Sequence, residues 1–241
     1  MSYRFTGRIR YSEIGEDGCL TLPGILNYFQ DCSTFQSESL HLGVEELKKR
    51  NRVWVLSSWQ VIVERYPGLG EEVETATWAY GFKGFIGTRN FTMKTADGEM
   101  LAYANTFWTY LDIERGVPAR LTEADTAGYE IEEKLPVEFA PRKIYLPPNC
   151  EKHGSFTVQK HHLDTNHHVN NCQYVRMAED YLPDGFTVHQ MRAEYKKQAR
   201  FGNVICPETC TEDGKFTVLL NTERGEPYAV VEFQDFIRQV E

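Results

Sequence analysis

The first half of the chain shows one helical pattern followed by several strand patterns. Over residues 22–40, apolar side chains recur at three- and four-residue steps on one face, and Pro23 suits a first helical turn. The segments that follow alternate between apolar and polar residues or are rich in β-branched and aromatic ones: 54–64, 72–80, 88–94 and 100–112. Because turn sequences separate these segments, the pattern predicts one helix followed by an antiparallel sheet.

The second half repeats this order after a connector. Residues 116–148 contain five prolines and lose periodicity. Beyond them, 156–161 is typical of a strand and 169–182 of a helix that ends at Pro183. Further strands are predicted at 188–198, 204–211, 216–221 and 228–237.

An internal repeat accounts for the two similar halves. Residues 66–73 resemble 198–205, and 97–102 resemble 224–229, although two generic hairpins would give similar matches. A long helix on a strongly curved antiparallel sheet is the hotdog arrangement. We therefore predict an α+β double hotdog, with an N-terminal hotdog at 1–118, a connector at 119–148 and a C-terminal hotdog at 149–241.

Charge and hydropathy exclude some classes of partner. The chain has 26 Lys and Arg against 35 Asp and Glu, a net charge of −9. This balance argues against a general nucleic-acid binder, which needs cations to neutralise phosphates. The longest apolar stretches, such as Val53-Trp54-Val55-Leu56, are far shorter than the roughly 20 residues that span a bilayer. Since the N-terminal segment also lacks the apolar core of a signal peptide, we expect no nucleic acid, no membrane contact and a cytoplasmic location.

The six cysteines stand singly, except for Cys206 and Cys210, which are four positions apart. A structural zinc site needs four ligands in close pairs, and there is no second pair. Disulfide frameworks are typical of small secreted chains. We therefore expect reduced, mostly buried cysteines, no metal site and no cofactor.

Polar groups concentrate at residues 161–174, the predicted junction of a strand and a helix. This segment holds four of the seven histidines, one carboxylate and three asparagines. The free N–H groups at a helix start can stabilise an oxyanion. Asp164 is a candidate general base for water, Asn166 can orient the water or a carbonyl, and His168 can donate a hydrogen bond or shuttle a proton.

Three non-catalytic interpretations of this segment are also open. Asp and Asn before a helix are ordinary caps, and a histidine cluster can be a solvated turn. A metal site is the third. It is disfavoured because His161 and His162 would point to opposite sides of a strand, and His167 and His168 would lie about 100° apart on a helix.

The stretch Leu163-Asp164-Thr165-Asn166-His167-His168-Val169-Asn170-Asn171, followed by Tyr174, resembles the D-x-N-x-H-V-N-N-x-x-Y motif of acyl-[acyl carrier protein] thioesterases. Residues 10–15, 53–55, 84–89 and 193–199 are also similar to this family, so the resemblance covers nearly the whole chain. It implies a double hotdog with its active site in the C-terminal half. It also implies hydrolysis of fatty acyl thioesters, with the acyl carrier protein (ACP) as partner.

The chain departs from the family at one strand motif. Plant members end this motif in Glu-Cys, whereas Gln198 and Ala199 stand here. Alanine is no nucleophile and a neutral amide is no base, so a Cys–His–Asn triad is excluded. We expect Asp164 to activate water, with Asn166 and His168 assisting and Gln198 holding the water. Cys172 is expected to be a buried residue of the helix face.

The resemblance places an acyl tunnel in the N-terminal half. Phe29, Trp54 and Trp59 are candidate walls, with plain core packing as the alternative, and Asn171 of the motif joins the substrate-binding set. Because carrier proteins are strongly acidic, docking on this acidic chain needs a local cation cluster. The candidates are four cations within nine residues: Arg192, Lys196, Lys197 and Arg200. The alternative is that these side chains only form a solvated face of a strand.

Two other functions stay open at this point. A hotdog enzyme acting on acyl-coenzyme A could use the same catalytic residues. A non-catalytic acyl-binding module is the second alternative, although the chain has no DNA-binding helix-turn-helix. A homodimer is a possible assembly, and the sequence fixes no chain-length preference.

Overall fold

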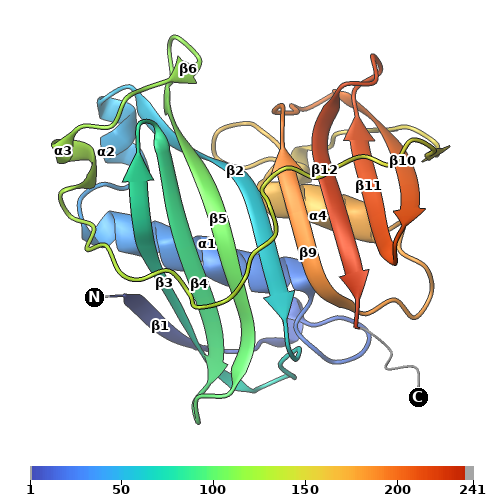
Figure 1. Ribbon diagram of the computed structural model, residues 1–241, viewed down its shortest axis with the longest axis horizontal. Coiled ribbons are helices and arrows are strands. Elements are labelled where there is room, and N and C mark those ends of the chain that lie inside the picture. The colour runs from blue at the N-terminus through green and yellow to red at the C-terminus, as the bar shows by residue number, and fades with distance from the viewer. Residues whose placement is uncertain (1, 237–241) are drawn as a thin grey trace. The chain divides into compact units, whose positions relative to one another are not determined.

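The computed structural model describes residues 2–236 and divides into two compact units. Unit 1 comprises Met1–Ser57 and Val61–Phe139, and unit 2 comprises Ser58–Gln60 and Ala140–Glu241. Each unit combines a helix with an antiparallel sheet (Figure 1). The boundary between Phe139 and Ala140 lies inside the predicted connector at 119–148.

Unit 1 contains five long strands in the order β1-β3-β4-β5-β2. Their bounds are Tyr3–Arg8 for β1, Arg52–Val63 for β2, Glu72–Lys83 for β3, Ile86–Thr95 for β4 and Met100–Asp112 for β5. The helices are η1 (Tyr11–Glu13), α1 (Leu22–Ser39), α2 (Val44–Lys49) and α3 (Glu123–Thr126), and β6 (Val117–Pro118) pairs with β5. The four predicted strands and the predicted helix are confirmed, whereas β1 and α2 were not predicted.

Helix α1 forms where its sequence places a cap, a proline and an apolar face. The Thr21 hydroxyl accepts the N–H of Gly24, and Pro23 stands in the first turn. The buried face packs on the sheet, with the rings of Phe29 and Phe91 at a centroid distance of 5.2 Å. Burial of this face supplies most of the stability of such a helix.

Unit 2 repeats the arrangement with a shorter helix, α4 (Asn171–Glu179), preceded by η2 (Lys160–His162). Its strands follow the order β9-β12-β11-β10-β7, and β8 pairs with β10. Their bounds are Glu151–Lys152 for β7, Phe156–Thr157 for β8, Val188–Tyr195 for β9, Val204–Glu212 for β10, Lys215–Asn221 for β11 and Pro227–Asp235 for β12. Residue 237, which ended the last predicted strand, lies outside the described residues.

The predicted repeat is confirmed by matching backbone hydrogen bonds in the two units. The N–H of Leu20 donates to the carbonyl of Pro67 at 2.8 Å, and that of Val169 donates to the carbonyl of Ala199 at 2.9 Å. These are equivalent positions in the predicted match of 66–73 with 198–205. The isolated bridges Ile14↔Leu20 and Leu163↔Val169 also correspond.

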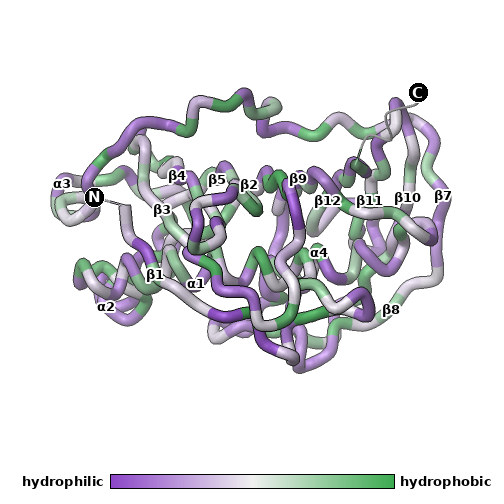
Figure 2. The backbone as a smooth tube through the Cα atoms, turned by 90° about the horizontal axis from the view of Figure 1, so that it is seen from below, coloured by the Kyte–Doolittle hydropathy of each residue, from purple (hydrophilic) through white to green (hydrophobic). Residues whose placement is uncertain are grey.

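The connector covers the face of each sheet that lies opposite the helix. In unit 1, Trp78 donates its indole N–H to the carbonyl of Glu133 at 2.8 Å. In unit 2, we name residues 140–150 the strap. Its Ile144 is buried and donates its N–H to Glu194 on β9 at 3.1 Å. Figure 2 shows the strap apart from the sheet of unit 2, on the side opposite α4.

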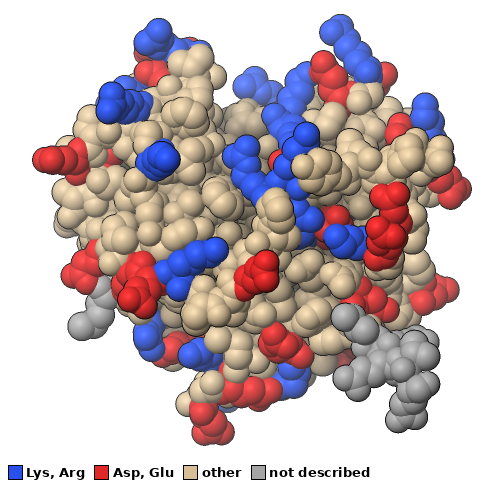
Figure 3. Space-filling model, in the orientation of Figure 1, with Lys and Arg blue, Asp and Glu red and all other residues tan. Residues whose placement is uncertain are grey.

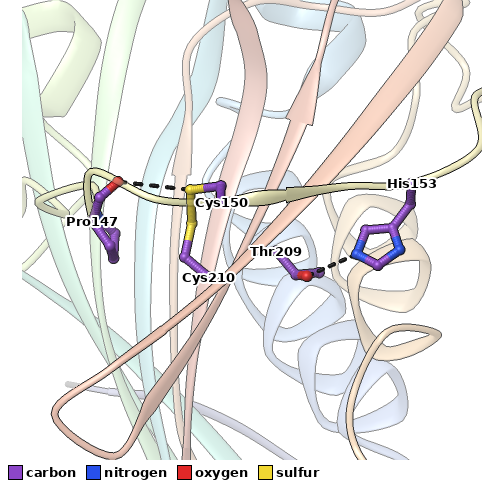
Figure 4. Close-up of a disulfide and its surroundings, with 5 residues drawn as sticks. All are labelled: Pro147, Cys150, His153, Thr209 and Cys210. Atoms are coloured by element: carbon purple, nitrogen blue, oxygen red, sulfur yellow. Dashed lines mark hydrogen bonds between the residues drawn. A yellow bond between two sulfur atoms is a disulfide. The ribbon is translucent and has the colours of Figure 1, made fainter.

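The strap ends in a disulfide, which contradicts the prediction that all cysteines are reduced. Cys150 and Cys210 are bonded, with a Cα–Cα distance of 4.6 Å (Figure 4). Strand β7 pairs Glu151 with Thr209, so the two cysteines occupy the next opposed positions along the same register. Sequence spacing could not predict this pairing, because it depends on the strap returning to β10.

Candidate active site

The loop from Asp164 to Val169 is built around one carboxylate. Asp164 Oδ1 accepts the N–H of Asn166 at 2.8 Å and that of His168 at 3.2 Å. The N–H of Asp164 in turn donates to the carbonyl of His168 at 2.8 Å. Short polar side chains favour such turns because they bond to the backbone two residues onward. Asp164 therefore shapes the loop on which the candidate residues stand.

Helix α4 begins later than the pattern predicted. Asn170 caps it by accepting the N–H of Cys172 at 2.9 Å, and Asn171 is the first helical residue. His167 has a φ of 60°, a left-handed conformation that ends any helical run. The placement of His167 and His168 on a helix was wrong, because both belong to the loop.

A second segment, 198–200, meets this loop. Tyr174 on α4 accepts the N–H of Ala199 at 2.9 Å, and the carbonyl of Ala199 accepts the N–H of Val169 at 2.9 Å. Arg200 Nε donates to His168 Nε2 at 3.2 Å. Gln198 is exposed and directly precedes Ala199. The structure thus brings Asp164, His168 and the 198–200 segment together.

Burial and charge set the protonation of His168. Desolvation and the neighbouring Arg200 lower its pKa below the ordinary 6.5, against a smaller opposing effect of Asp164. His168 is therefore mainly neutral at pH 7. A neutral imidazole carries one N–H donor and one acceptor nitrogen.

His161 and His162 lie in η2 rather than in a strand. The strand predicted at 156–161 is therefore found only at Phe156–Thr157. The rings of His161 and His162 meet edge to face at 4.2 Å between centroids. His162 Nδ1 accepts the N–H of Gln159 at 3.0 Å. Over residues 2–236, no group of His, Cys, Asp and Glu side chains could hold a metal ion.

Cys172 lies in the core beneath the motif. Its exposure is 3%, and burial raises the pKa of its thiol to about 12. The thiolate is the nucleophilic form of cysteine. The predicted helix-face position is confirmed, and this thiol is protonated at neutral pH.

The candidate substrate-binding aromatics are enclosed to different degrees. Phe29 is 0% exposed in unit 1, and Trp59 is buried in unit 2. Trp54 of unit 1 is half-buried and packs its ring against Tyr110 at 4.8 Å. Phe29 thus occupies a core position in this structure.

Arg192 was wrongly assigned to a docking surface. It is only 7% exposed, and its guanidinium lies 2.8 Å from the Glu232 carboxylate. It also donates to the carbonyls of Pro141 and Lys143 in the strap. A charge that is buried and paired in this way is not available to a partner.

Two of the remaining predicted cations are exposed and ion-paired. Lys196 lies 2.8 Å from Glu194, and Lys197 lies 3.2 Å from Glu226. Sequence reasoning missed Arg142 and Lys143, two exposed cations of the strap, because that segment has no periodicity. In Figure 3, Lys and Arg side chains gather over the strap and the adjoining end of β9.

A cavity of about 300 Å³ opens between the strap and the sheet of unit 2. Its walls combine apolar side chains with two lysines: Lys143, Ile144, Tyr145, Leu146, Glu194, Lys196, Pro227 and Val230. None of the candidate catalytic residues lines it.

Over residues 2–236, no helix is long and apolar enough to cross a membrane.

Two hotdog units in one chain, with a polar loop before the second helix, define a double-hotdog protein with one candidate hydrolytic site. Models of the acyl-ACP thioesterase N-terminal and C-terminal domains match residues 1–129 and 147–234. The chain belongs to the acyl-ACP thioesterase family.

Individual relatives agree with this assignment. The chain is 25% identical over 255 residues to a chloroplastic acyl-[acyl-carrier-protein] hydrolase of Cuphea viscosissima, covering 95% of this chain and 61% of that protein. The chain therefore spans about three-fifths of the length of this curated relative.

Solved structures share the fold. An acyl-ACP thioesterase from Bacteroides thetaiotaomicron superposes with a TM-score of 0.88 at 20% identity, over 97% of both chains. A 12:0-ACP thioesterase from Umbellularia californica gives 0.83 at 20% identity, over 97% of this chain and 96% of that one. The predicted α+β double hotdog is confirmed.

Proposed function

We propose that this chain hydrolyses the thioester of fatty acyl-ACP and releases a free fatty acid. The observation that carries the proposal is the loop in which Asp164 meets His168 and segment 198–200, in a chain of this family. The relatives are named as hydrolases of acyl-ACP, and both domain models of their family match here.

Asp164 is the proposed general base. Its Oδ1 holds the turn, and its Oδ2 takes no part in those two bonds. A water that gives its proton to Asp164 attacks the thioester carbonyl, so a C–O bond forms and the C–S bond breaks. The thiolate leaves and takes up a proton. Because a thiolate is a good leaving group, no strong acid is required.

Three further side chains assist in this scheme. Asn166, exposed beside Asp164, orients the water or the carbonyl. Gln198 holds the water, since an amide both donates and accepts hydrogen bonds. Asn171, at the start of α4, contacts the substrate close to the reacting group. The high pKa of the Cys172 thiol supports direct hydrolysis over a cysteine nucleophile.

Phe29, Trp54 and Trp59 are kept as proposed substrate-binding side chains, each within its own unit. Trp54 is half-buried, whereas Phe29 and Trp59 are buried. An acyl chain that reached Phe29 or Trp59 would therefore require these side chains to move. The chain length accepted stays open.

The acidic carrier is proposed to dock on exposed cations of unit 2. Of the predicted set, Lys196, Lys197 and Arg200 are exposed, and Arg142 and Lys143 of the strap join them. An acyl-CoA thioesterase is the second candidate function, since the same catalytic residues serve both thioesters.

The cytoplasmic location, the homodimer and the domain bounds at 118 and 148 stay predictions.

The substitution Asp164→Asn tests the catalytic scheme. An amide oxygen can still accept the N–H groups of Asn166 and His168, so the loop should persist while the base is lost. We expect kcat on acyl-ACP to fall about 100-fold or more, with a melting temperature close to that of the wild type.

The matched control is Asp184→Asn, which removes one exposed carboxylate from a turn of unit 2. It should leave kcat unchanged. Full activity of a folded Asp164→Asn protein would rule out Asp164 as the base.

A further inference from the structure

The pairing of Arg200 with His168 fixes which nitrogen of the imidazole carries its proton. Arginine has N–H donors and no acceptor, so the 3.2 Å contact requires Arg200 Nε–H to donate and His168 Nε2 to accept. In the neutral ring, the remaining proton then resides on Nδ1. The hydrogen bond therefore selects one tautomer of His168.

We propose that Arg200 is a positioning residue that holds His168 as a neutral hydrogen-bond donor through Nδ1–H. With Nε2 engaged, His168 cannot accept a proton there without losing Arg200. Its role in the proposed hydrolysis, on which this inference rests, is thus to donate to the reacting carbonyl or the water-binding group. Asp164 remains the base.

The charges around His168 favour this state. Burial, Arg200 and His167 disfavour protonation of the His168 ring, whereas Asp164 favours it. Desolvation is the largest of these effects. The neutral ring is therefore favoured at pH 7, and its pKa lies below the ordinary histidine value.

The internal repeat indicates that the loop does not need this pair in order to fold. In unit 1, Cys19 and Gly68 occupy the positions of His168 and Arg200. The turn there closes with the same backbone bonds, such as Gly15 N–H to the Cys19 carbonyl at 2.8 Å. Because unit 1 makes this turn without an arginine, folding of the turn does not account for the side-chain pair in unit 2, which supports a role at the site.

This assignment removes Arg200 from the docking set. A docking cation changes the affinity for an acidic partner and its salt dependence. A positioning residue changes the protonation and orientation of His168 instead. The two roles therefore predict different measurements.

The first test reads His168 directly and needs no substrate. Protein labelled with ¹⁵N at histidine is titrated by NMR as wild type, Arg200→Met and Lys197→Met, with His168→Gln for assignment. The wild type should show the Nδ1–H tautomer and a midpoint below 6.5. In Arg200→Met, the Nε2–H tautomer should appear and the midpoint should rise.

Lys197→Met is the matched control, since it removes one exposed cation that bonds to Glu226. It should leave the tautomer and the midpoint of His168 unchanged. An unaltered tautomer and midpoint in Arg200→Met would overturn the proposal, whether or not the chain hydrolyses acyl-ACP.

The second test is kinetic. With acyl-ACP as substrate, Arg200→Met should lower kcat about 10-fold with little change in KM, and should move the acid limb of the pH profile upward. A raised KM with unchanged kcat would assign Arg200 to docking and contradict positioning. If the wild type hydrolyses no acyl-ACP, the proposed function fails while the NMR result still decides the role of Arg200.

Discussion

At the scale of single residues, Asp164 combines an observed structural role with the proposed role of general base. Its Oδ1 closes the turn, and capping of α4 is left to Asn170. The sequence offered capping and catalysis as alternatives for Asp164, and the structure assigns the cap to Asn170. The motif residues could be predicted because they are adjacent in sequence. The contact of His168 with Arg200, 32 positions away, depends on the meeting of two loops.

Cys172 provides a residue-scale prediction. Replacing it with alanine should leave kcat and KM on acyl-ACP within about twofold of wild type, because a thiol with a pKa of about 12 supplies no thiolate at neutral pH. The lost packing should lower the free energy of unfolding by about 1 kcal/mol. Steady-state kinetics and urea unfolding measure the two effects. An inactive Cys172→Ala protein of native stability would refute direct hydrolysis.

At the scale of elements, the helices and strands with strong periodicity could be predicted and the strap could not. Helix α1 and strand β5 show a clear period, so their bounds were found within a residue or two. The strap instead lies on polar anchors, including the carbonyl bonds from Arg192 and the bond from Ile144 N–H to Glu194. A buried arginine with such partners looks identical in sequence to an exposed one.

The disulfide is the other anchor of the strap. Replacing both Cys150 and Cys210 with serine should lower the free energy of unfolding by about 4 kcal/mol, because the bond closes a chain segment of 60 residues. Urea unfolding under non-reducing conditions measures this loss. Cys206→Ser, on the same strand, is the control and should cost much less.

Equal stability of the serine double variant and the wild type would contradict a structural role for the disulfide.

Disulfides are rare in reducing cytosol. The bond therefore lends no support to the predicted cytoplasmic location, and the redox state of Cys150 in the cell bears directly on that prediction.

At the scale of the whole molecule, an acidic chain is proposed to bind an acidic carrier. A net charge of −9 opposes such an encounter at long range, so the exposed cations of unit 2 must provide local attraction. Two of the predicted cations do not join the proposed docking set, because Arg192 is buried and Arg200 contacts His168. Lys196 stays in the set, since it is exposed although it is paired with Glu194.

The most direct test compares the wild-type protein on carrier-bound and coenzyme A-bound thioesters of the same chain lengths, at low and high salt. We predict that kcat/KM is at least about 10-fold higher for acyl-ACP, and that this advantage shrinks as salt screens the docking cations. Faster turnover of acyl-CoA, or tight binding of acyl-ACP without turnover, would contradict the proposed function.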